Sequence, residues 1–535
     1  MSTHFNAASW LVERHLDEGR GATTAIVSDA GARTYDQLAG DVWAAGNGLA
    51  AAGVRPGERV VLVMNDEPAL PALLLGTMRI GAVAIPVSTM LTAGELAEIT
   101  ADAAAAALVV SDAYTGHVAT ITAGAPSVRV VVTAGPPGSV DVGLRPIPVI
   151  AWSDLHERRP PPDPGTDGDA PALWLYTSGT TGRPKGAIHR HASLRATAET
   201  YARAVLGAGP DDRFYSVAKL FFAFGLGNAL TFPFAVGATA ILDPGRPTPA
   251  RVAELAERYQ PTLFFAPPGF CAALVDSGVD AAVLTSVRYA VTAGETLPAD
   301  LWRRFRDRFG VEILDGIGTT EALHIFCSNH PGDIRPGSTG RPVAGYECKL
   351  LDERGAEVTE ANVAGFLHVR GDSIATGYWR RPEATAIAFV DGWLRTGDVY
   401  SRDSDGYYAY FGRTNDLIKP GGIWVSPAEV EAVLTENDDV LEVAVVGGRD
   451  ADGLEVAVAF VVARAGRRVD PDALLARCRG RMAGFKRPRH VIVVDELPKT
   501  ATGKVRRFAL RDLLAGDALT PEMLSRRSDP GSGSA

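Results

Sequence analysis

One stretch of the chain constrains its fold and chemistry more than any other: the run Thr-Ser-Gly-Thr-Thr-Gly-Arg-Pro-Lys-Gly at residues 177–186. It follows an apolar run, residues 171–175, that predicts a buried strand. Because hydroxyls and glycines alternate, backbone N–H and side-chain O–H groups can converge on one anion, and Lys185 can add its charge. The pattern is not a Walker A sequence, which requires Gly-x-x-x-x-Gly-Lys-Ser/Thr. A flexible surface turn is the alternative, but a linker has no need of Arg-Pro-Lys-Gly at its end. The stretch therefore predicts a phosphate-binding loop.

Length and composition limit the classes of protein to which the chain can belong. A chain of 535 residues is too long for one core, so we expect roughly two to four folding units. The net charge of −10 and the lack of a long basic run argue against nucleic-acid binding. The four cysteines form no Cys-x-x-Cys pair, which favours a reducing compartment over a disulfide framework or a zinc site. Residues 1–20 lack a signal-peptide core and no run is long enough to span a bilayer, so we expect a cytoplasmic protein that does not bind membranes.

The first four hundred residues alternate between helical and strand patterns. Helices are predicted at residues 41–52 and 69–80, and strands at 59–64 and 108–111. This alternation is typical of parallel sheets in an α/β fold. Residues 134–170, rich in Pro, Gly and Asp, are predicted to connect two subdomains.

After residue 398 the pattern changes to that of a small α+β unit of roughly a hundred residues. Strands are predicted at 406–411, 441–446, 454–462 and 490–494, and helices at 427–435 and 471–482. We therefore predict a large N-terminal domain of stacked α/β sheet subdomains (residues 1–414), a small α+β C-terminal domain (415–515) and a disordered tail (516–535).

Four further motifs carry candidate chemistry. Asp-Gly-Ile-Gly-Thr-Thr-Glu at 315–321 combines glycines, which allow close approach of a ligand, with a carboxylate whose hard oxygens suit Mg²⁺. The others are Trp-Leu-Arg-Thr-Gly-Asp at 393–398, Gly-Arg-Thr-Asn-Asp-Leu-Ile-Lys at 412–419 and Leu-Pro-Lys-Thr-Ala-Thr-Gly-Lys at 497–504. Taken singly they are weak, because a lone Asp in a turn is usually a cap and a lone Lys on a loop is usually solvated.

Taken together and in this order, the five motifs resemble those of the adenylate-forming superfamily, which includes acyl- and aryl-CoA synthetases, peptide-synthetase adenylation domains and luciferases. The resemblance extends from about residue 5 to about residue 514. It implies that a carboxylic acid attacks the α-phosphate of ATP to give an acyl-AMP and pyrophosphate. A thiol, usually that of CoA, then attacks the acyl carbonyl and releases AMP. The implied cofactors and cosubstrates are ATP, Mg²⁺ and CoA.

The resemblance also assigns roles to residues. Those implied to bind the nucleotide are Thr177, Ser178, Gly179, Thr181, Gly182, Lys185, Gly294, Glu295, Thr296, Asp315, Gly316, Ile317, Thr320, Asp398 and Arg413. The implied catalytic residues are Lys504, Thr180, Glu321 and Lys419. Thr180 and Glu321 would lie near Mg²⁺, and Lys504 would bridge the acid's carboxylate and the α-phosphate.

In this family the small domain is mobile and rotates between the two half-reactions. The implied hinge is Asn415, where the family usually has Asp or Lys. Asn tolerates positive φ, so a working hinge is expected. After the rotation Lys504 would leave the site and Lys419 would face it. Phe485, Arg487 and Arg489 resemble a segment that contacts the CoA nucleotide, with a solvated basic turn as the alternative.

The sequence also bears on the acid. The run Tyr-Ser-Val-Ala-Lys-Leu-Phe-Phe-Ala-Phe-Gly-Leu-Gly-Asn at 215–228 resembles benzoate–CoA ligases, as do residues 5–8 and 323–326. Amino-acid-activating relatives place an Asp in this phenylalanine-rich stretch to bind the amine, and none occurs from 221 to 227. A structural role for the histidine at 324 is an open alternative. The residues predicted to form the acid pocket are Phe222, Ala223, Phe224, Gly318, His324 and Ile325.

The leading hypothesis is an ATP-dependent ligase that joins benzoate, or a small substituted benzoate, to CoA. A free-standing enzyme that loads a carrier-protein phosphopantetheine thiol is the first alternative. A luciferase-like oxidase and a non-catalytic nucleotide-binding homologue are the others. The sequence leaves open the ring substituents, the thiol acceptor, the pathway, the effect of Asn415 and the oligomeric state, for which a homodimer is one alternative.

Overall fold

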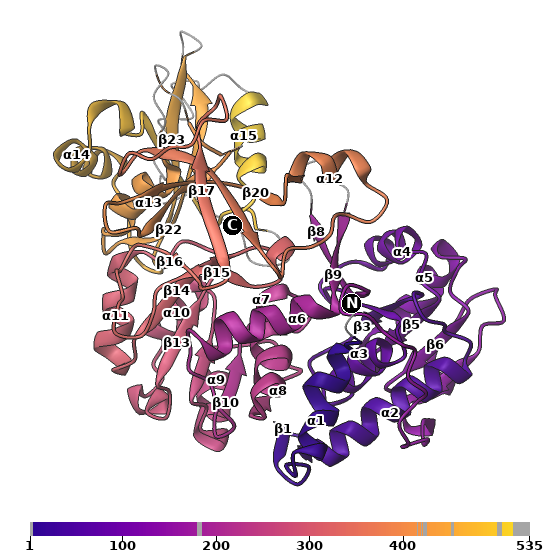
Figure 1. Cartoon of the computed structure of the whole chain (residues 1–535). Helices are drawn as coiled ribbons and strands as arrows, with labels where there is room; N and C mark the ends of the chain where they lie inside the picture. The colour runs from indigo at the N-terminus through magenta and orange to yellow at the C-terminus, as the bar shows by residue number, and fades with distance from the viewer. Residues whose placement is uncertain are drawn as a thin grey trace, which may run out of the picture. The chain divides into compact units, whose positions relative to one another are not determined.

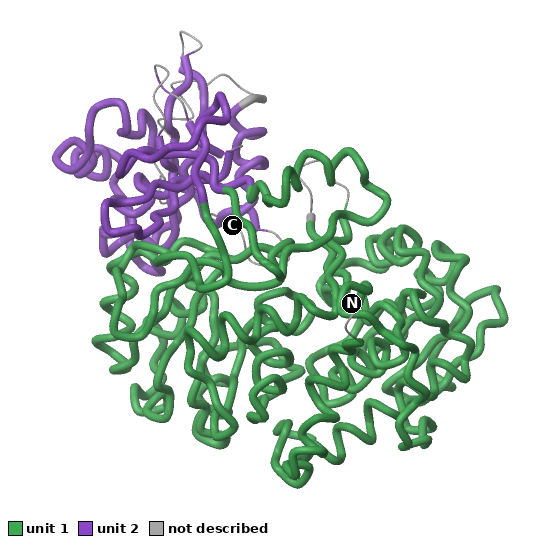
Figure 2. The backbone as a smooth tube through the Cα atoms, in the orientation of Figure 1, with its two compact units in different colours: residues 1–348, 368–396 green, residues 349–367, 397–535 purple. Residues whose placement is uncertain are grey.

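The structure is a computed structural model (Figure 1) that describes residues 4–178, 184–414, 416–418, 420, 425–450, 454–499 and 505–516. The chain divides into two compact units (Figure 2). The first comprises Met1–Cys348 and His368–Thr396, and the second comprises Lys349–Leu367 and Gly397–Ala535. The domain boundary after Thr414 stays a prediction. Nearly all of the tail for which we predict disorder, residues 517–535, lies outside the described residues.

The first unit contains a seven-stranded sheet that is parallel except for its last strand. The strands, in spatial order, are β7 (Val149–Ala151), β6 (Val130–Thr133), β5 (Ala107–Val110), β3 (Arg59–Val63), β4 (Val83–Pro86), β8 (Pro171–Ser178) and β9 (Pro184–Arg190). The alternation of helices and strands in the sequence predicts such a sheet, and the prediction is confirmed.

Four helices pack with this sheet (Figure 1): α2 (Tyr35–Ala51), α3 (Ala69–Arg79), α4 (Ala93–Asp102) and α5 (Val118–Gly124). Helix α2 packs on α3 and α4 packs on α5. The side chains of β3 and β5 that face α4 and α5 are fully buried, as the period of two along a strand requires. Helix α2 begins six residues before the sequence pattern predicts, because Thr34 and Gln37 form a reciprocal capping box at its start.

The segment 134–170 is more than a connector. It contributes β7, whose Val149 and Ile150 pair with Val131 and Val132 of β6. A three-residue strand has too little periodicity to be predicted from sequence, since its pairing comes from the neighbouring strand.

A second, nine-stranded sheet lies in the same unit. Its strands, in spatial order, are β16 (Arg341–Pro342), β15 (Ile325–Ser328), β14 (Ile313–Gly318), β13 (Tyr289–Thr292), β12 (Leu263–Phe265), β10 (Arg213–Ser216), β11 (Thr239–Ile241), β1 (Thr24–Ser28) and β2 (Gly31–Thr34). The helices of this part are α1 (Arg14–Asp17), α6 (His191–Thr197), α7 (Ala223–Leu226), α8 (Phe232–Val236), α9 (Pro249–Tyr259), α10 (Pro268–Asp276) and α11 (Ala299–Phe309).

The central strands of this sheet run parallel and end together. Ser216 pairs with Phe265, Phe265 pairs with Val291, and Thr292 pairs with Asp315. The segments that follow strands β10, β13 and β14 therefore leave from one edge, which is where α/β sheets bind ligands.

Two more sheets follow along the chain. The residues of the five-stranded sheet belong partly to each unit, because residues 368–396 are in the first, whereas the three-stranded sheet lies in the second. The five-stranded sheet has the order β17 (Tyr346–Leu351), β18 (Ala364–Gly371), β20 (Trp393–Arg402) and β19 (Phe389–Val390), with β21 (Tyr408–Arg413) paired to β20; helix α12 (Pro382–Ala388) precedes β19. The three-stranded sheet consists of β22 (Val440–Arg449), β23 (Glu455–Ala463) and β24 (His490–Val494), with helices α13 (Pro427–Thr435), α14 (Pro471–Arg481) and α15 (Arg507–Gly516). Each element predicted after residue 398 is present, within about three residues of its predicted bounds.

Candidate active site

Strands β8 and β9 form the two arms of the predicted phosphate loop. They pair antiparallel, with Thr177 opposite Lys185. Residues 179–183, which include the predicted Gly179, Thr180, Thr181 and Gly182, lie outside the described residues, as does the side chain of Ser178. The far edge of β9 pairs with the segment 376–379: Trp379 N–H donates to Gly186 (2.9 Å) and Ile188 N–H donates to Gly377 (3.0 Å).

This pairing brings together the predicted phosphate lysine and the predicted magnesium ligand. The Tyr378 hydroxyl donates to Glu321 Oε1 at 2.6 Å. Lys185 Nζ lies 5.4 Å from the centre of the same tyrosine ring, within cation–π distance. Tyr378 is a residue that sequence reasoning missed. Its only signal is the run Gly-Tyr-Trp at 377–379, which is equally typical of aromatic core residues.

Three hydrogen bonds hold the main chain of residues 320–322. His189 Nε2 donates to the Thr320 carbonyl (2.9 Å), Ala375 N–H to the Glu321 carbonyl (2.8 Å), and the Ser373 hydroxyl to the Ala322 carbonyl (2.6 Å). Burial lowers the pKa of His189 to about 4, so its ring is neutral. The Thr320–Glu321 turn is thus fixed to β9 and to the segment 373–375.

The carboxyl ends of β13 and β14 carry further residues that are predicted to bind the nucleotide. Thr292 Oγ1 donates to Asp315 Oδ1 at 2.7 Å. Gly294 has a φ of 89°, which favours glycine. Glu295 Oε2 accepts from Gly269 N–H (3.1 Å), so the carboxylate joins the loop after β13 to the start of α10.

Burial raises the pKa of Asp315 from 3.8 to about 8, although hydrogen bonds from Thr292 and Gly316 N–H oppose the rise. Between these two pH values the folded chain keeps a proton that the unfolded chain has released. The contribution of this carboxyl to the free energy of unfolding is therefore expected to decrease as the pH rises from about 4 to about 8. Asp315→Asn, which cannot titrate, should flatten that part of the pH dependence of chemical denaturation. An unchanged slope between pH 5 and pH 8 would contradict the shifted pKa.

His324 lies at the centre of a ring cluster in the predicted acid pocket. Its ring centre is 4.4 Å from that of Phe232, 5.2 Å from that of Tyr201 and 5.5 Å from that of Phe224. Nε2 is 3.0 Å from Asn228 Oδ1, to which it donates. Burial lowers the pKa of His324 to about 3, so the imidazole is an uncharged, flat group. The histidine is therefore hydrogen-bonded through Nε2 and is also part of an aromatic surface.

The remaining predicted pocket residues adjoin this cluster. Phe222, Ala223 and Phe224 are partly exposed, at the start of α7, whereas Ile325 is buried and pairs with Gly318. A Cβ on Gly318 would lie 2.5 Å from the His324 carbonyl oxygen, so β14 and β15 approach this closely only because glycine is there.

Gly227 makes a second close approach, to the His324 ring. A Cβ on Gly227 would lie 2.3 Å from His324 Cδ2. Because the ring is enclosed, Gly227→Ala is expected to lower the free energy of unfolding by about 1–3 kcal/mol and to weaken acid binding. Thermal unfolding and the KM for the acid measure the two effects. Gly209→Ala is the control, since its Cβ would have no neighbour within 4 Å. Equal effects of both changes would contradict this packing.

The other predicted residues lie in the second unit. Asp398 and Arg413 are opposite each other on β20 and β21, and Arg413 Nε lies 2.7 Å from Asp398 Oδ1. Thr414 N–H and Oγ1 both donate to the Gly397 carbonyl (3.0 Å each). The predicted hinge Asn415 and the predicted catalytic Lys419 and Lys504 lie outside the described residues.

The predicted CoA-binding residues lie between α14 and β24. Phe485 is 41% exposed and Arg489 is exposed, whereas Arg487 Nε donates to the Met482 carbonyl (2.8 Å). The intervening Lys486 forms an ion pair with Glu429 at 2.7 Å. Phe485 and Arg489 are therefore presented to solvent, as a docking segment requires.

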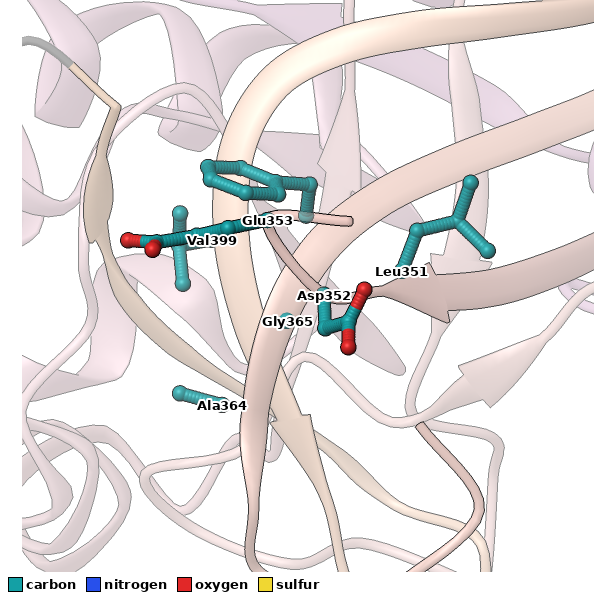
Figure 3. Close-up of a pocket in the computed structure, with 7 residues that line it drawn as sticks. Leu351, Asp352, Glu353, Ala364, Gly365 and Val399 are labelled. Atoms are coloured by element: carbon teal, nitrogen blue, oxygen red, sulfur yellow. The ribbon is translucent and has the colours of Figure 1, made fainter. Parts of the chain in front are cut away.

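A separate pocket in the second unit is not the predicted site. It has a volume of about 90 Å³, well below the ~300–1,000 Å³ of ligand pockets. Figure 3 shows the carboxylates of Asp352 and Glu353 pointing in different directions beside it. Its lining residues are Leu351, Asp352, Glu353, Ala364, Gly365, Phe366 and Val399.

The predicted magnesium site can be tested on its donor set. In the described ranges, no three His, Cys, Asp or Glu side chains form a group able to hold a metal ion. Mg²⁺ bound with a nucleotide usually needs only one or two carboxylates, because phosphates and water supply the other ligands. Glu321, half-buried and oriented by Tyr378, fits that requirement.

Two family descriptions match the chain: AMP-binding enzyme over residues 12–379 and AMP-binding enzyme C-terminal domain over residues 429–504. The chain belongs to the AMP-binding enzyme family. It is 44% identical to a benzoate–CoA ligase of Thauera aromatica, covering 95% of this chain and 96% of that relative. It is 38% identical to a 4-hydroxybenzoate–CoA/benzoate–CoA ligase of Rhodopseudomonas palustris, with 96% and 95% covered.

Solved structures of the AMP-binding enzyme family agree with the fold described here. A benzoate CoA ligase from Burkholderia xenovorans superposes with a TM-score of 0.86 at 40% identity, covering 95% of this chain and 100% of that one. The anthranilate CoA ligase AuaEII in complex with anthranoyl-AMP gives a TM-score of 0.89 at 36% identity, with 96% and 98% covered. The predicted α/β fold and the predicted superfamily are confirmed. In the described parts of this AMP-binding enzyme, no helix combines the length and apolarity needed to cross a membrane.

Proposed function

We propose that this enzyme is an AMP-forming aryl acid–CoA ligase acting on benzoate or a small substituted benzoate. It would activate the acid with ATP to an acyl-AMP and then transfer the acyl group to CoA. The observation that carries the proposal is the aromatic surface around the neutral His324, beside the Thr320–Glu321 turn and the β8–β9 hairpin.

The chemistry of this surface favours an uncharged ring. Phe224 and His324 have an interplanar angle of 31°, and no acidic residue occurs from 221 to 227 to bind an amine. An amino acid would therefore leave its ammonium group without a partner, which is costly in a buried site. A flat aromatic acid fills the same space without that cost.

The residues around the ATP phosphates would act by positioning and by charge. Lys185 would place its ammonium on the β- and γ-phosphates, and Thr320 would donate to the α-phosphate. Mg²⁺, when bound by Glu321 and Thr180, supplies neutralisation of phosphate charge. Lys504 would hold the acid's carboxylate against the α-phosphate and stabilise the charge that develops there.

Asp398 and Arg413, which form an ion pair, would bind the ribose of ATP. The second half-reaction would use the remaining predicted residues. The small domain would turn at Asn415, so that Lys504 leaves and Lys419 faces the site. Phe485, Arg487 and Arg489 would contact the CoA nucleotide, since cationic side chains pair with its phosphates.

ATP–pyrophosphate exchange tests the adenylation step directly. Exchange that depends on benzoate in the absence of CoA is the expected result, because acyl-AMP formation is reversible and needs no thiol. If benzoate supported no exchange while another class of acid did, the proposed substrate class would be wrong.

Phe224 gives a sharper test of substrate class, because it belongs to the aromatic slot formed by Phe222, Ala223, Phe224 and His324. Phe224→Ala removes a ring that contacts His324 and Phe265, so we expect a rise of roughly tenfold in the KM for benzoate. Bulkier aryl acids should gain relative to benzoate, because the slot becomes wider. The ratio of kcat/KM values across benzoate, 4-substituted benzoates and cinnamate measures this. An unchanged acid profile would remove Phe224 from the pocket wall.

A carrier-protein thiol as acceptor is not favoured, since the relatives compared above are CoA ligases over nearly their full length. Comparing CoA with a phosphopantetheinylated carrier protein as acceptor would decide the matter. We also propose a cytoplasmic location, which the four cysteines support because none of them forms a disulfide and disulfides are rare in reducing compartments. A homodimer remains one alternative for the oligomeric state, which sedimentation would determine.

A further inference from the structure

A buried carboxylate contacts the chain shortly before the predicted pocket residues 222–224, and it comes from the other sheet of the first unit. Asp66 follows β3 and is 3% exposed. Leu220 N–H donates to both of its oxygens, at 3.1 Å to Oδ1 and 3.3 Å to Oδ2. A carboxylate of the seven-stranded sheet thereby binds the main chain just after β10 of the nine-stranded sheet.

The neighbouring Lys219 supplies the opposite charge. Burial raises the pKa of Asp66 to about 6, and the positive charge of Lys219 lowers it, so the carboxylate is ionised at neutral pH. Lys219 Nζ in turn donates to the carbonyl of Asp243, which follows β11. The Arg251 guanidinium donates to the Asp243 carboxylate (3.2 Å) and so holds the residue whose carbonyl accepts from Lys219.

These contacts hold the turn that leads into the slot. Phe222 N–H donates to the Lys219 carbonyl (3.0 Å), and Leu226 N–H donates to the Phe222 carbonyl (2.8 Å). A Cβ on Gly225 would lie only 2.1 Å from the Lys219 carbonyl oxygen, so the chain folds back tightly on this turn. Any shift of Lys219 and Leu220 would therefore move Phe222 and Phe224.

We propose that Asp66 is a positioning residue for the aryl slot: through Leu220 N–H and Lys219 it fixes the turn that carries Phe222, Ala223 and Phe224 against His324. This inference rests on the proposed function, because the slot is the surface on which the aromatic acid would bind. Asp66 itself acts only through that turn.

Asp66→Asn is the direct test. Asparagine keeps an oxygen that can accept from Leu220 N–H but loses the negative charge that attracts Lys219. The KM for benzoate is expected to rise about tenfold or more, the effect of losing a charge-assisted hydrogen bond. The KM for ATP and the kcat at saturating benzoate should stay within about twofold, because binding of the acid alone is changed.

Two further variants separate positioning from general stability. Asp212→Asn removes a carboxylate at the other end of β10, where it accepts from Gly209 N–H and pairs with Arg288. It should lower the melting temperature without changing the KM for benzoate. In Asp66→Asn/Lys219→Met both charges are lost, so the KM for benzoate should rise less than the product of the two single effects.

The outcomes decide the inference. It is overturned if Asp66→Asn lowers the melting temperature, as Asp212→Asn does, but leaves the KM for benzoate unchanged. It is also overturned if Asp66→Asn raises the KM values for benzoate and ATP equally. If Asp66→Asn does not fold, Lys219→Met alone carries the test, with the same expected split between the two KM values. Absence of benzoate turnover in the unmodified enzyme would instead contradict the proposed function.

Discussion

Lys504→Ala is expected to lower the rate of acyl-AMP formation by about 10²–10³-fold, the usual cost of removing one group that stabilises developing charge. The lysine would be needed where the acid's carboxylate meets the α-phosphate. Once the acyl-AMP exists, that charge has been resolved, so transfer of a supplied benzoyl-AMP to CoA should proceed at nearly the normal rate. Burst experiments with ATP and benzoate, and single-turnover experiments with benzoyl-AMP and CoA, measure the two steps separately.

The matched control is Lys499→Ala. Lys499 belongs to the same motif but forms an ion pair with Glu442 on β22 (2.6 Å). It should leave both half-reactions close to normal. If Lys504→Ala slowed both steps equally, the lysine would not have the role assigned to it.

Glu321→Gln is expected to have the second large effect, lowering the adenylation rate by about 10²–10³-fold. The change keeps the size of the side chain and an oxygen that can accept from Tyr378, so the local packing should persist. It removes the negative charge through which the carboxylate would bind Mg²⁺. The Mg²⁺ concentration for half-maximal pyrophosphate exchange should therefore rise together with the loss of rate.

Tyr378→Phe is the partner variant for this prediction. It keeps the carboxylate and loses only the hydroxyl that orients it, so a loss of about tenfold is expected, in line with one hydrogen bond to a charged group. If Glu321→Gln stayed within about threefold of the unmodified enzyme at limiting Mg²⁺, Glu321 would not be a magnesium ligand.

The parts of this site that sequence could predict are those in which local residues carry the chemistry. The apolar run at 171–175 and the hydroxyl–glycine run after it define a strand and a loop without any distant contact, and β8 and β9 flank that loop. The elements of the small α+β unit could also be predicted, since strands β22 and β23 have long apolar patterns and turn residues at both ends.

The contacts that sequence could not predict join distant segments. Tyr378 meets Glu321 because β9 pairs with the chain some 190 residues later, and no local pattern encodes that pairing. His324 bonds Asn228 across a separation of 96 residues, which is why the sequence left its role open. Asp66 reaches Leu220 from a different sheet, 154 residues away.

The start of helix α2 has a local sequence signal. Thr34 and Gln37 have the spacing of a capping box, and that local signal predicts the start of α2 six residues earlier than hydrophobic periodicity does. Strand β7 is different, because its three residues have no pattern of their own and pair only where β6 already lies.

The most direct test of the central claim is AMP release from ATP and Mg²⁺ with a panel of acids, each run with and without CoA. The panel should contain benzoate, hydroxy-, amino- and halobenzoates, cinnamate, phenylacetate and octanoate. The account predicts CoA-dependent turnover that is highest with benzoate or one small substituted benzoate and negligible with octanoate. Turnover highest with octanoate, or acid-dependent pyrophosphate exchange without any CoA-dependent turnover, would contradict it.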